Sequence, residues 1–231
     1  MIKYKEVLTD IFFDLDHTLW DFEKNSMLTF DKIFNEQMLS IDLEQFIFYY
    51  NPINHDYWKK YRENKISQDE LRYNRLADTF NQIKFKTTNS QIDQISEAYI
   101  SYLSSFSHLF EGAIPLLEKL KLNYNLHIIT NGFEQVQNLK IKNSGLKTFF
   151  DFIFTAEQVG FKKPHPQIFK EALNQTKADP KKALMIGDSL EADILGALTQ
   201  GMHAIHFNSH QEELHDKCLI VNSLNELNSL F

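Results

Sequence analysis

The sequence of 231 residues predicts an α/β protein in which a block of helices interrupts a parallel sheet after its first strand. All seven glycines lie at or after Gly112, and only Pro52 among the five prolines precedes Pro115, so tight turns concentrate in the second half. Short apolar runs alternate with helical patterns in that half, which is typical of right-handed crossovers in a parallel sheet. One strand-like run, residues 11–13, stands alone before a long helical stretch. We therefore expect a Rossmann-like parallel-sheet core with a helical insertion.

The expected strands are short, apolar and buried. They are residues 11–13, 126–129, 152–154, 183–186 and 204–207. Helical patterns follow the second and later runs, for example over residues 168–173 and 189–199. This organisation predicts an α/β core of residues 1–19 and 108–231 and a helical domain of residues 20–107.

The stretch from about residue 22 to residue 107 predicts about four helices. Its clearest apolar stripe steps by three or four residues through Ile92, Ile95, Tyr99, Tyr102 and Phe106. Ser90 stands where the N-cap of that helix is expected. Ser67 and Glu70 have the spacing of a capping box, which predicts the start of another helix.

Composition excludes several classes of protein. The chain has 24 Lys and Arg against 31 Asp and Glu, so its net charge of −7 disfavours a general nucleic-acid binder. No apolar run approaches the ~20 residues that span a bilayer, and MIKYKEVLTD has no hydrophobic stretch of a secretory signal. Cys218 is the only cysteine, which excludes an internal disulfide and a cysteine-built zinc site. We expect a cytoplasmic protein that binds neither membranes nor nucleic acid; the sequence does not specify its oligomeric state.

Polar residues gather at the predicted carboxyl ends of the strands, where open parallel sheets bind ligands. They are Asp14 and Asp16 after the first strand, Thr130 and Asn131 after the second, Asp188 and Asp193 after the fourth, and Lys163 in a loop before a helix. Four carboxylates at one edge would raise one another's pKa values unless a cation lay among them. Hard oxygen ligands without cysteine predict Mg²⁺ held by Asp14, Asp16, Asp188 and Asp193, with Asp193 binding directly or through water.

Position suggests a role for each remaining group. Asp14, at the strand tip, is expected to attack phosphorus and form an aspartyl-phosphate. Asp16 would protonate the leaving oxygen and later deprotonate water. Thr130 and Asn131 would hold phosphate oxygens near a helix N-terminus. Lys163 would offset the charge of nucleophile and phosphate, although Lys162 competes for that role.

These motifs resemble those of the haloacid dehalogenase-like phosphohydrolases over essentially the whole chain. The carrying segments are Asp14-Leu-Asp16-His-Thr18-Leu19, Thr130-Asn-Gly, Lys163-Pro and Gly-Asp188 with Asp193 five residues later. The resemblance implies a C1-type cap for the helical insertion. A closer resemblance is to the pyrimidine 5′-nucleotidases of that superfamily. It rests on Trp20-Asp-Phe22, Ile129-Thr-Asn-Gly-Phe133, Val159-Gly-Phe-Lys-Lys-Pro164, Gly187 to Ala197, and Phe207-Asn-Ser-His210.

The resemblance implies an enzyme that hydrolyses a small phosphate ester, most specifically a pyrimidine nucleoside monophosphate. Phosphatases of phosphoglycolate or sugar phosphates share most of these segments, and a phosphomutase shares the acid pair. A catalytically silent binding protein on the same fold is the alternative outside enzymes. The intact set of Asp14, Asp16, Lys163 and Asp188 disfavours that alternative.

Several side chains near the motifs have two interpretations. Trp20 and Phe22, on the connection into the helical insertion, either stack on a nucleobase and set specificity or pack at a hinge. His17 is interpreted as a loop side chain. His203 and His206 are three apart on a predicted strand, so they point to opposite faces and do not share a metal.

Overall fold

The computed structural model describes residues 7–231. Residues 1–6, which hold most of the segment where we expect no secretory signal, lie outside the described residues. The chain forms two compact units, one of residues up to Phe22 together with Ser107–Phe231 and one of Glu23–Phe106. These divisions lie within three residues of the boundaries expected from the sequence, and the cap function of the second unit stays a prediction.

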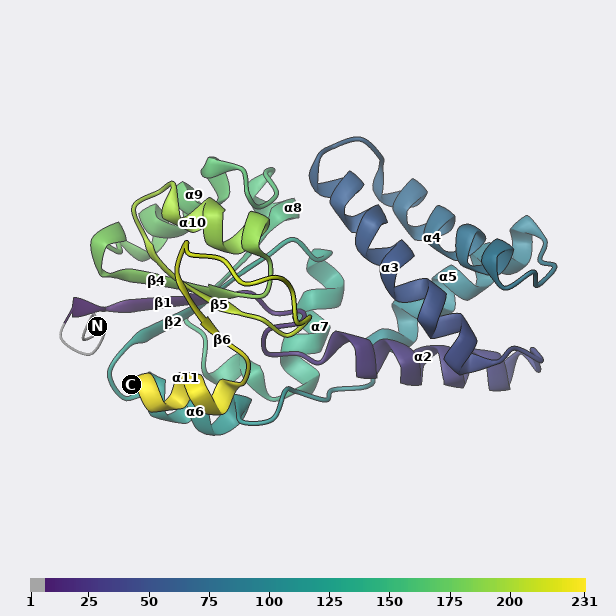
Figure 1. Cartoon of the computed structure of the whole chain (residues 1–231), viewed down its shortest axis with the longest axis horizontal. Coiled ribbons are helices and arrows are strands. Elements are labelled where there is room, and N and C mark those ends of the chain that lie inside the picture. Colours follow the sequence, from purple (N-terminus) through teal and green to yellow (C-terminus); the bar gives the residue numbers. More distant parts are fainter. Residues whose placement is uncertain (1–6) are drawn as a thin grey trace. The chain divides into compact units, whose positions relative to one another are not determined.

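The first unit contains a six-stranded, fully parallel sheet with the strand order β3-β2-β1-β4-β5-β6 (Figure 1). The strands are β1 (Asp10–Phe13), β2 (Asn125–Thr130), β3 (Phe152–Thr155), β4 (Ala183–Gly187), β5 (His203–Phe207) and β6 (Leu219–Val221). The predicted α/β fold class is confirmed, and each of the five expected strands is present. The edge strand β6 was not expected, because three apolar residues are too short a pattern to separate from a loop.

Helices cover both faces of this sheet. Helices α6 (Ala113–Lys121) and α11 (Leu224–Leu230) lie on one face, and α9 (Pro166–Thr176) and α10 (Gly196–Leu198) lie on the other (Figure 1). The unit also contains α7 (Glu134–Asn143), α8 (Ala156–Val159), the 3₁₀ turns η1 (Leu146–Thr148) and η2 (Pro180–Lys182), and the π-helical turn η3 (Leu190–Leu195). Under α9 and α10, Phe12, Ile129, Phe169 and Met185 are among the buried residues of one apolar cluster. Removing this surface from water holds the helices on the sheet.

The strand register brings the ends of the central strands together. Phe13 of β1 pairs with Ile128 of β2 and with Ile186 of β4. Because all three strands run in the same direction, their following residues emerge at the same edge of the sheet. Asp14, Thr130 and Asp188 are therefore brought to one place by backbone pairing.

The second unit is made of helices. They are α2 (Phe22–Glu36), which begins at the last residue of the first unit, α3 (Leu43–Arg62), α4 (Gln68–Gln82) and α5 (Asn89–Leu103). The ring of Phe30 lies 4.7 Å, centroid to centroid, from each of the rings of Phe46, Tyr50 and Tyr99. This aromatic cluster joins three of the four helices and accounts for the apolar spacing in the sequence.

Two helix starts test the capping predictions. Ser67 begins α4 with a capping box to Glu70, as predicted. The Ser90 prediction was wrong, because Thr88 is the N-cap of α5. The Gln91 amide N–H donates to Thr88 Oγ1 at 3.2 Å, and the Thr88 amide N–H donates to Gln91 Oε1 at 2.9 Å. Thr88 has the glutamine three residues later that closes a box, and Ser90 does not.

Replacing Thr88 by Ala is expected to lower the free energy of unfolding by about 1 kcal/mol, since an orphan amide N–H of α5 loses its acceptor. Ser90→Ala, inside the first turn, is the matched control and is expected to change stability by less than about half of that. Urea denaturation of both variants checks the assignment, which equal losses would contradict.

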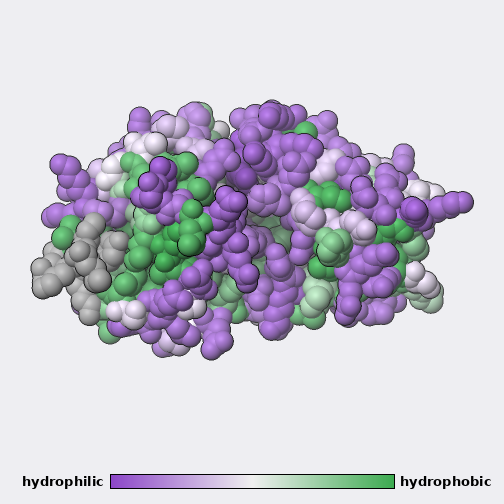
Figure 2. All heavy atoms as spheres, in the orientation of Figure 1, coloured by the Kyte–Doolittle hydropathy of each residue, from purple (hydrophilic) through white to green (hydrophobic). Residues whose placement is uncertain are grey.

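Hydrophilic residues cover most of the face drawn in Figure 2, in keeping with the acidic composition. Large apolar side chains are also exposed, including Phe48 in the second unit and Leu122 in the first. Within residues 7–231, no helix is both long enough and apolar enough to cross a membrane. The cytoplasmic location stays a prediction.

Candidate active site

Asp14 stands directly after β1, where the chain turns back on itself. Its amide N–H donates to the Ile186 carbonyl at 2.9 Å and so continues the pairing with β4. The His17 amide N–H donates to the Trp20 carbonyl at 3.0 Å, and the Trp20 amide N–H donates to the Leu15 carbonyl at 2.9 Å. His17 has a φ of 61°, in the left-handed region, which allows this tight return. The loop therefore fixes both ends of the segment that holds Asp14 and Asp16.

Three of the predicted acids meet at this edge. Asp14, Asp188 and Asp193 each offer a carboxylate oxygen, and these oxygens lie within 4.8 Å of one another. The Lys163 ammonium lies among them, 2.5 Å from Asp14 Oδ1 and 2.7 Å from Asp193 Oδ1. Lys163 also donates to the Ile129 carbonyl at 2.7 Å and is only 2% exposed. Lys163 thus contacts the candidate nucleophile, and its choice over Lys162 for the catalytic role stays a prediction.

Asn131 holds the lysine loop in place. Its side chain accepts from the Lys163 amide N–H at 2.7 Å and donates to the Lys163 carbonyl at 2.9 Å. The Lys163–Pro164 peptide bond is cis. Asn131 therefore fixes the backbone from which the lysine reaches the acids, and its predicted phosphate contact stays a prediction.

The segment after β4 is shaped around Asp193. A Cβ at Gly187 would collide with the Asp193 carboxylate, so glycine makes room for this side chain at the strand end. Asp193 Oδ2 accepts from the Ser189 amide N–H at 3.0 Å. The Ser189 hydroxyl in turn accepts from the Ala192 amide N–H at 3.1 Å at the start of η3. These bonds leave the other Asp193 oxygen facing Lys163.

Burial and mutual repulsion set the electrostatics of the acid cluster. Burial raises the pKa of Asp14 well above its ordinary value; Lys163 opposes this shift, and Asp193 and Asp188 add to it. Burial likewise raises the pKa of Asp193, opposed by Lys163 and reinforced by Asp188. Burial would lower the pKa of Lys163, but the charges of Asp14 and Asp193 outweigh it and raise the value. One lysine cannot balance three carboxylates, so the cluster fits an additional cation that prefers oxygen ligands.

Asp188 has a different environment on its outer side. Thr18 Oγ1 donates to Asp188 Oδ1 at 3.4 Å, and His210 Nε2 lies 3.3 Å from Asp188 Oδ2. Burial would raise the pKa of Asp188, but the hydrogen bond from His210 and the proximity of His17 outweigh it and lower the value. Asp188 is therefore the acid of the cluster that is most readily ionised.

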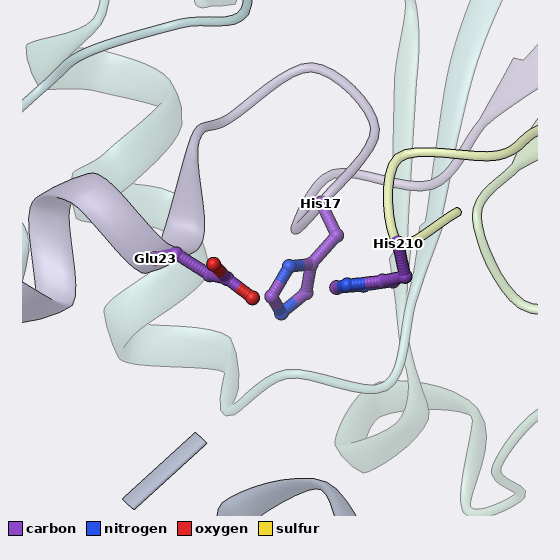
Figure 3. A group of neighbouring side chains, drawn as sticks. All are labelled: His17, Glu23 and His210. Carbon is purple, nitrogen blue, oxygen red and sulfur yellow. The ribbon is translucent and has the colours of Figure 1, made fainter. Parts of the chain in front are cut away.

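Figure 3 shows the His17 ring, from the loop after β1, facing the His210 ring, from the loop after β5. The two ring centroids are 4.5 Å apart, and burial lowers the pKa of His17 to about 4. His17 thus packs against His210, which is itself a neighbour of Asp188. From the sequence, His17 was interpreted only as a loop side chain. His210 was not predicted as a site residue, because its loop has no periodic pattern. His203 and His206 contact different groups, the Lys181 and Asp188 carbonyls respectively.

Asp16 lies outside the three-acid cluster. Its Oδ1 accepts from Lys140 Nζ at 2.6 Å, and its Oδ2 accepts from Gln137 Nε2 at 3.0 Å. Lys140 Nζ also lies 4.2 Å from the Trp20 ring centroid and 5.2 Å from that of Phe22. The roles of Asp16 as a metal ligand and of Trp20 and Phe22 as specificity residues stay predictions, and in this structure Lys140 occupies one face of the Trp20 ring.

Sequence reasoning missed Gln137 and Lys140, although α7 carries a signal for them. The stripe at positions i, i+3, i+4, i+7 and i+8 consists of Phe133, Val136, Gln137, Lys140 and Ile141, and all five are buried. Polar residues at two core positions of an amphipathic helix cost free energy unless they have partners. Such an interruption of an apolar stripe indicates a buried polar site.

Comparison with known proteins shows the family of the chain. Residues 11–207 match the family described as haloacid dehalogenase-like hydrolase. The chain belongs to this family. Within it, the chain is 31% identical to the pyrimidine 5′-nucleotidase YjjG of Escherichia coli, over 95% of this chain and 96% of that protein. It is 35% identical to the pyrimidine 5′-nucleotidase PynA of Streptococcus pneumoniae, over 89% and 86% of the two chains.

A solved structure of a haloacid dehalogenase-like hydrolase extends the comparison. The magnesium-bound HAD-hydrolase YfnB of Bacillus subtilis is 26% identical and superposes with a TM-score of 0.86, covering 97% of this chain and 98% of that one. The predicted family resemblance, including its nucleotidase branch, is confirmed, as is the prediction that the chain is an enzyme of the hydrolase class.

Proposed function

We propose that this chain is a Mg²⁺-dependent phosphomonoesterase that forms an aspartyl-phosphate on Asp14 and acts as a 5′-nucleotidase on pyrimidine nucleoside monophosphates. The observation that carries the reaction type is the buried contact of Lys163 with Asp14 beside two further acids, with Asp16 held separately. The substrate class is supported by the similarity to two pyrimidine 5′-nucleotidases over most of the chain.

In the first half-reaction, an Asp14 oxygen attacks phosphorus while the bond from phosphorus to the ester oxygen breaks. Asp16 gives a proton to that departing oxygen, which leaves as an alcohol. Lys163 lies against the attacking carboxylate and offsets the negative charge that gathers there. Thr130 and Asn131, at the end of β2, are the proposed phosphate-binding residues.

In the second half-reaction, Asp16 takes a proton from water, and the resulting hydroxide attacks the phosphorus of the aspartyl-phosphate. The bond between Asp14 and phosphorus breaks, so Asp14 is regenerated and inorganic phosphate is released. Two carboxylates with separate partners suit this division, because Lys163 holds Asp14 and Lys140 holds Asp16, so that each carboxylate is positioned independently of the other.

Asp14, Asp188 and Asp193 are the proposed magnesium ligands, with Asp16 a further candidate at the end of β1. Their hard oxygen donors and their excess of negative charge over Lys163 fit this ion. Bound Mg²⁺ would supply positive charge that lets the carboxylates and a phosphate group share one site.

A panel of phosphate esters, assayed for released phosphate with and without Mg²⁺, tests the proposal. Pyrimidine 5′-monophosphates are expected to be hydrolysed faster than purine 5′-monophosphates, phosphoglycolate and a hexose phosphate. A preference for phosphoglycolate or the hexose phosphate would overturn the nucleotidase assignment. Isomerised ester without free phosphate would indicate a mutase, and no turnover of any ester would indicate a binding protein.

The metal site gives a prediction that does not depend on activity. Mg²⁺ at about 100 times its dissociation constant is expected to stabilise the wild-type fold by about 2.7 kcal/mol. Asp188→Ala is expected to lose most of this stabilisation, because it removes the most readily ionised acid of the cluster. Thermal melting with Mg²⁺ or with a chelator measures the difference.

Glu191→Gln is the matched control, since Glu191 is an exposed acid in the same segment. This variant should respond to Mg²⁺ as the wild type does. An undiminished response in Asp188→Ala would place the ion elsewhere, and full turnover in chelator would remove the metal from the proposal.

A further inference from the structure

Helix α7 carries two buried polar side chains, Gln137 and Lys140, that contact Asp16. Gln137 and Lys140 are one turn apart, and they are only 1% and 2% exposed. A lysine is rarely buried to this extent unless its charge has a partner, and the partner here is Asp16 at 2.6 Å. The proposed reaction depends on Asp16 but assigns no role to Gln137 or Lys140.

Together the two side chains bind both oxygens of Asp16. Lys140 donates to Oδ1 and Gln137 donates to Oδ2. The Asp16 backbone is held as well, since the hydrogen bonds between Leu15, His17 and Trp20 close the loop around it. Both the backbone and the side-chain orientation of this carboxylate are therefore fixed.

Gln137 also reaches the proposed phosphate site. Its Nε2 donates to Thr130 Oγ1 at 2.7 Å, and the Gly132 amide N–H donates to the same oxygen at 3.1 Å. A Cβ at Gly132 would collide with Gln137, so glycine leaves space for this contact. A hydroxyl oxygen that accepts two hydrogen bonds has its proton left to donate, which suits contact with a phosphate oxygen.

Two aromatic rings pack against the Lys140 ammonium and stabilise its positive charge at this position. Lys140 Nζ lies over the faces of Trp20 and Phe22, at 4.2 and 5.2 Å from their centroids. Aromatic faces attract a cation without accepting its proton, and they keep water from it. In the described part of the chain, Lys140 and Lys163 are the two buried lysines, and each is paired with a different one of the two reacting carboxylates.

We propose that Lys140 and Gln137 are positioning residues that hold Asp16 for proton transfer to the leaving oxygen, with Trp20 sheltering Lys140. This inference rests on the proposed function. The step concerned is the first half-reaction, in which the Asp14–phosphorus bond forms, the phosphorus–ester oxygen bond breaks, and the Asp16 proton goes to that oxygen. A misplaced Asp16 would slow this step in proportion to how much the departing oxygen needs the proton.

The leaving group therefore provides the test. A nucleoside 5′-oxygen departs as a strongly basic alkoxide unless it is protonated, whereas 4-nitrophenolate departs readily without a proton. For Lys140→Met, kcat/KM on uridine 5′-monophosphate is expected to fall about 10- to 100-fold more than on 4-nitrophenyl phosphate. Lys140→Arg, which keeps the charge and the donor, should recover part of the loss, and Gln137→Leu should show a smaller selective loss.

Exposed residues of the same helix provide controls. Lys142→Met and Gln135→Leu change equivalent side chains on the outer face of α7 and are expected to leave both rates within about twofold. Asp16→Asn is the reference for a lost proton donor, and it should show the full selective loss on the nucleotide. Thermal melting reports whether each variant folds; if Lys140→Met does not, Lys140→Arg and Gln137→Leu carry the comparison.

The outcomes separate the two proposals. A wild-type protein that hydrolyses neither ester overturns the proposed function, and Asp16→Asn without leaving-group dependence overturns the role of Asp16 and this inference together. If Asp16→Asn is selective but the α7 variants lose both substrates equally, the proposed function stands and Gln137 and Lys140 serve only packing.

Discussion

Asp14→Asn is expected to reduce turnover by more than about 10³-fold, because the amide oxygen is far too weak a nucleophile to displace an ester oxygen from phosphorus. Steady-state release of phosphate from the best ester of the panel measures the loss. Wild-type protein quenched during turnover should carry phosphate in a linkage that hydroxylamine cleaves, and the variant should carry none.

Asn has nearly the shape of Asp, so the fold should persist. Lys163 keeps its contact with Asp193 in the variant, and one member of a repelling acid cluster is removed. Asp10→Asn is a matched control on the same strand, since Asp10 is a buried acid at the opposite end of β1, 3.1 Å from His127. It should alter stability but keep turnover within a fewfold. Turnover of Asp14→Asn within about tenfold of wild type, a barrier change of only ~1.4 kcal/mol, would exclude Asp14 as the nucleophile.

The sequence predicted the sheet and a group of acids at one edge of it because both depend on local patterns. That predicted group had four members, and in the structure Asp16 lies outside the cluster of the other three. A buried strand followed by an acid is visible in Ile11 to Asp14 and again in Ala183 to Asp188. Parallel pairing then forces the strand ends to one edge, so no long-range information was needed to group these acids. Strand β6 escaped prediction because three residues form no pattern that exceeds chance.

The partners of Asp16 could not be predicted in the same way. The contact between Asp16 and Lys140 joins residues far apart in the chain, and it exists only once α7 packs beside the loop after β1. His210 reaches Asp188 from a loop whose path no periodicity determines. The N-cap of α5 was predicted wrongly for a more local reason. Ser90 and Thr88 are both good N-cap residues, and Thr88 is preferred because Gln91, three residues later, closes a capping box with it. Side-chain pairing across elements is therefore what the structure adds to the motifs.

Lys163→Met is expected to have the largest effect on stability, lowering the free energy of unfolding by about 3–5 kcal/mol at neutral pH without divalent ions. The variant removes the buried cation that contacts Asp14 and Asp193 and leaves their charges uncompensated. Turnover should fall as well, since nucleophile and phosphate lose a compensating charge. Urea denaturation and steady-state rates measure the two losses. Lys162→Met, at the neighbouring half-buried lysine, is the control and should cost far less.

The stability of the Lys163→Met variant is also expected to depend on pH in a definite direction. Lys163 opposes the raised pKa values of Asp14 and Asp193, so its removal should raise both values further. The folded variant would then hold protons that the unfolded chain releases, and its stability should rise as the pH is lowered from 7 toward 5. Mg²⁺ should also restore part of the stability by replacing the lost positive charge. An equal loss in Lys162→Met, or a Lys163→Met deficit that neither lower pH nor Mg²⁺ reduces, would mean that the lysine stabilises the fold through packing and not through its charge.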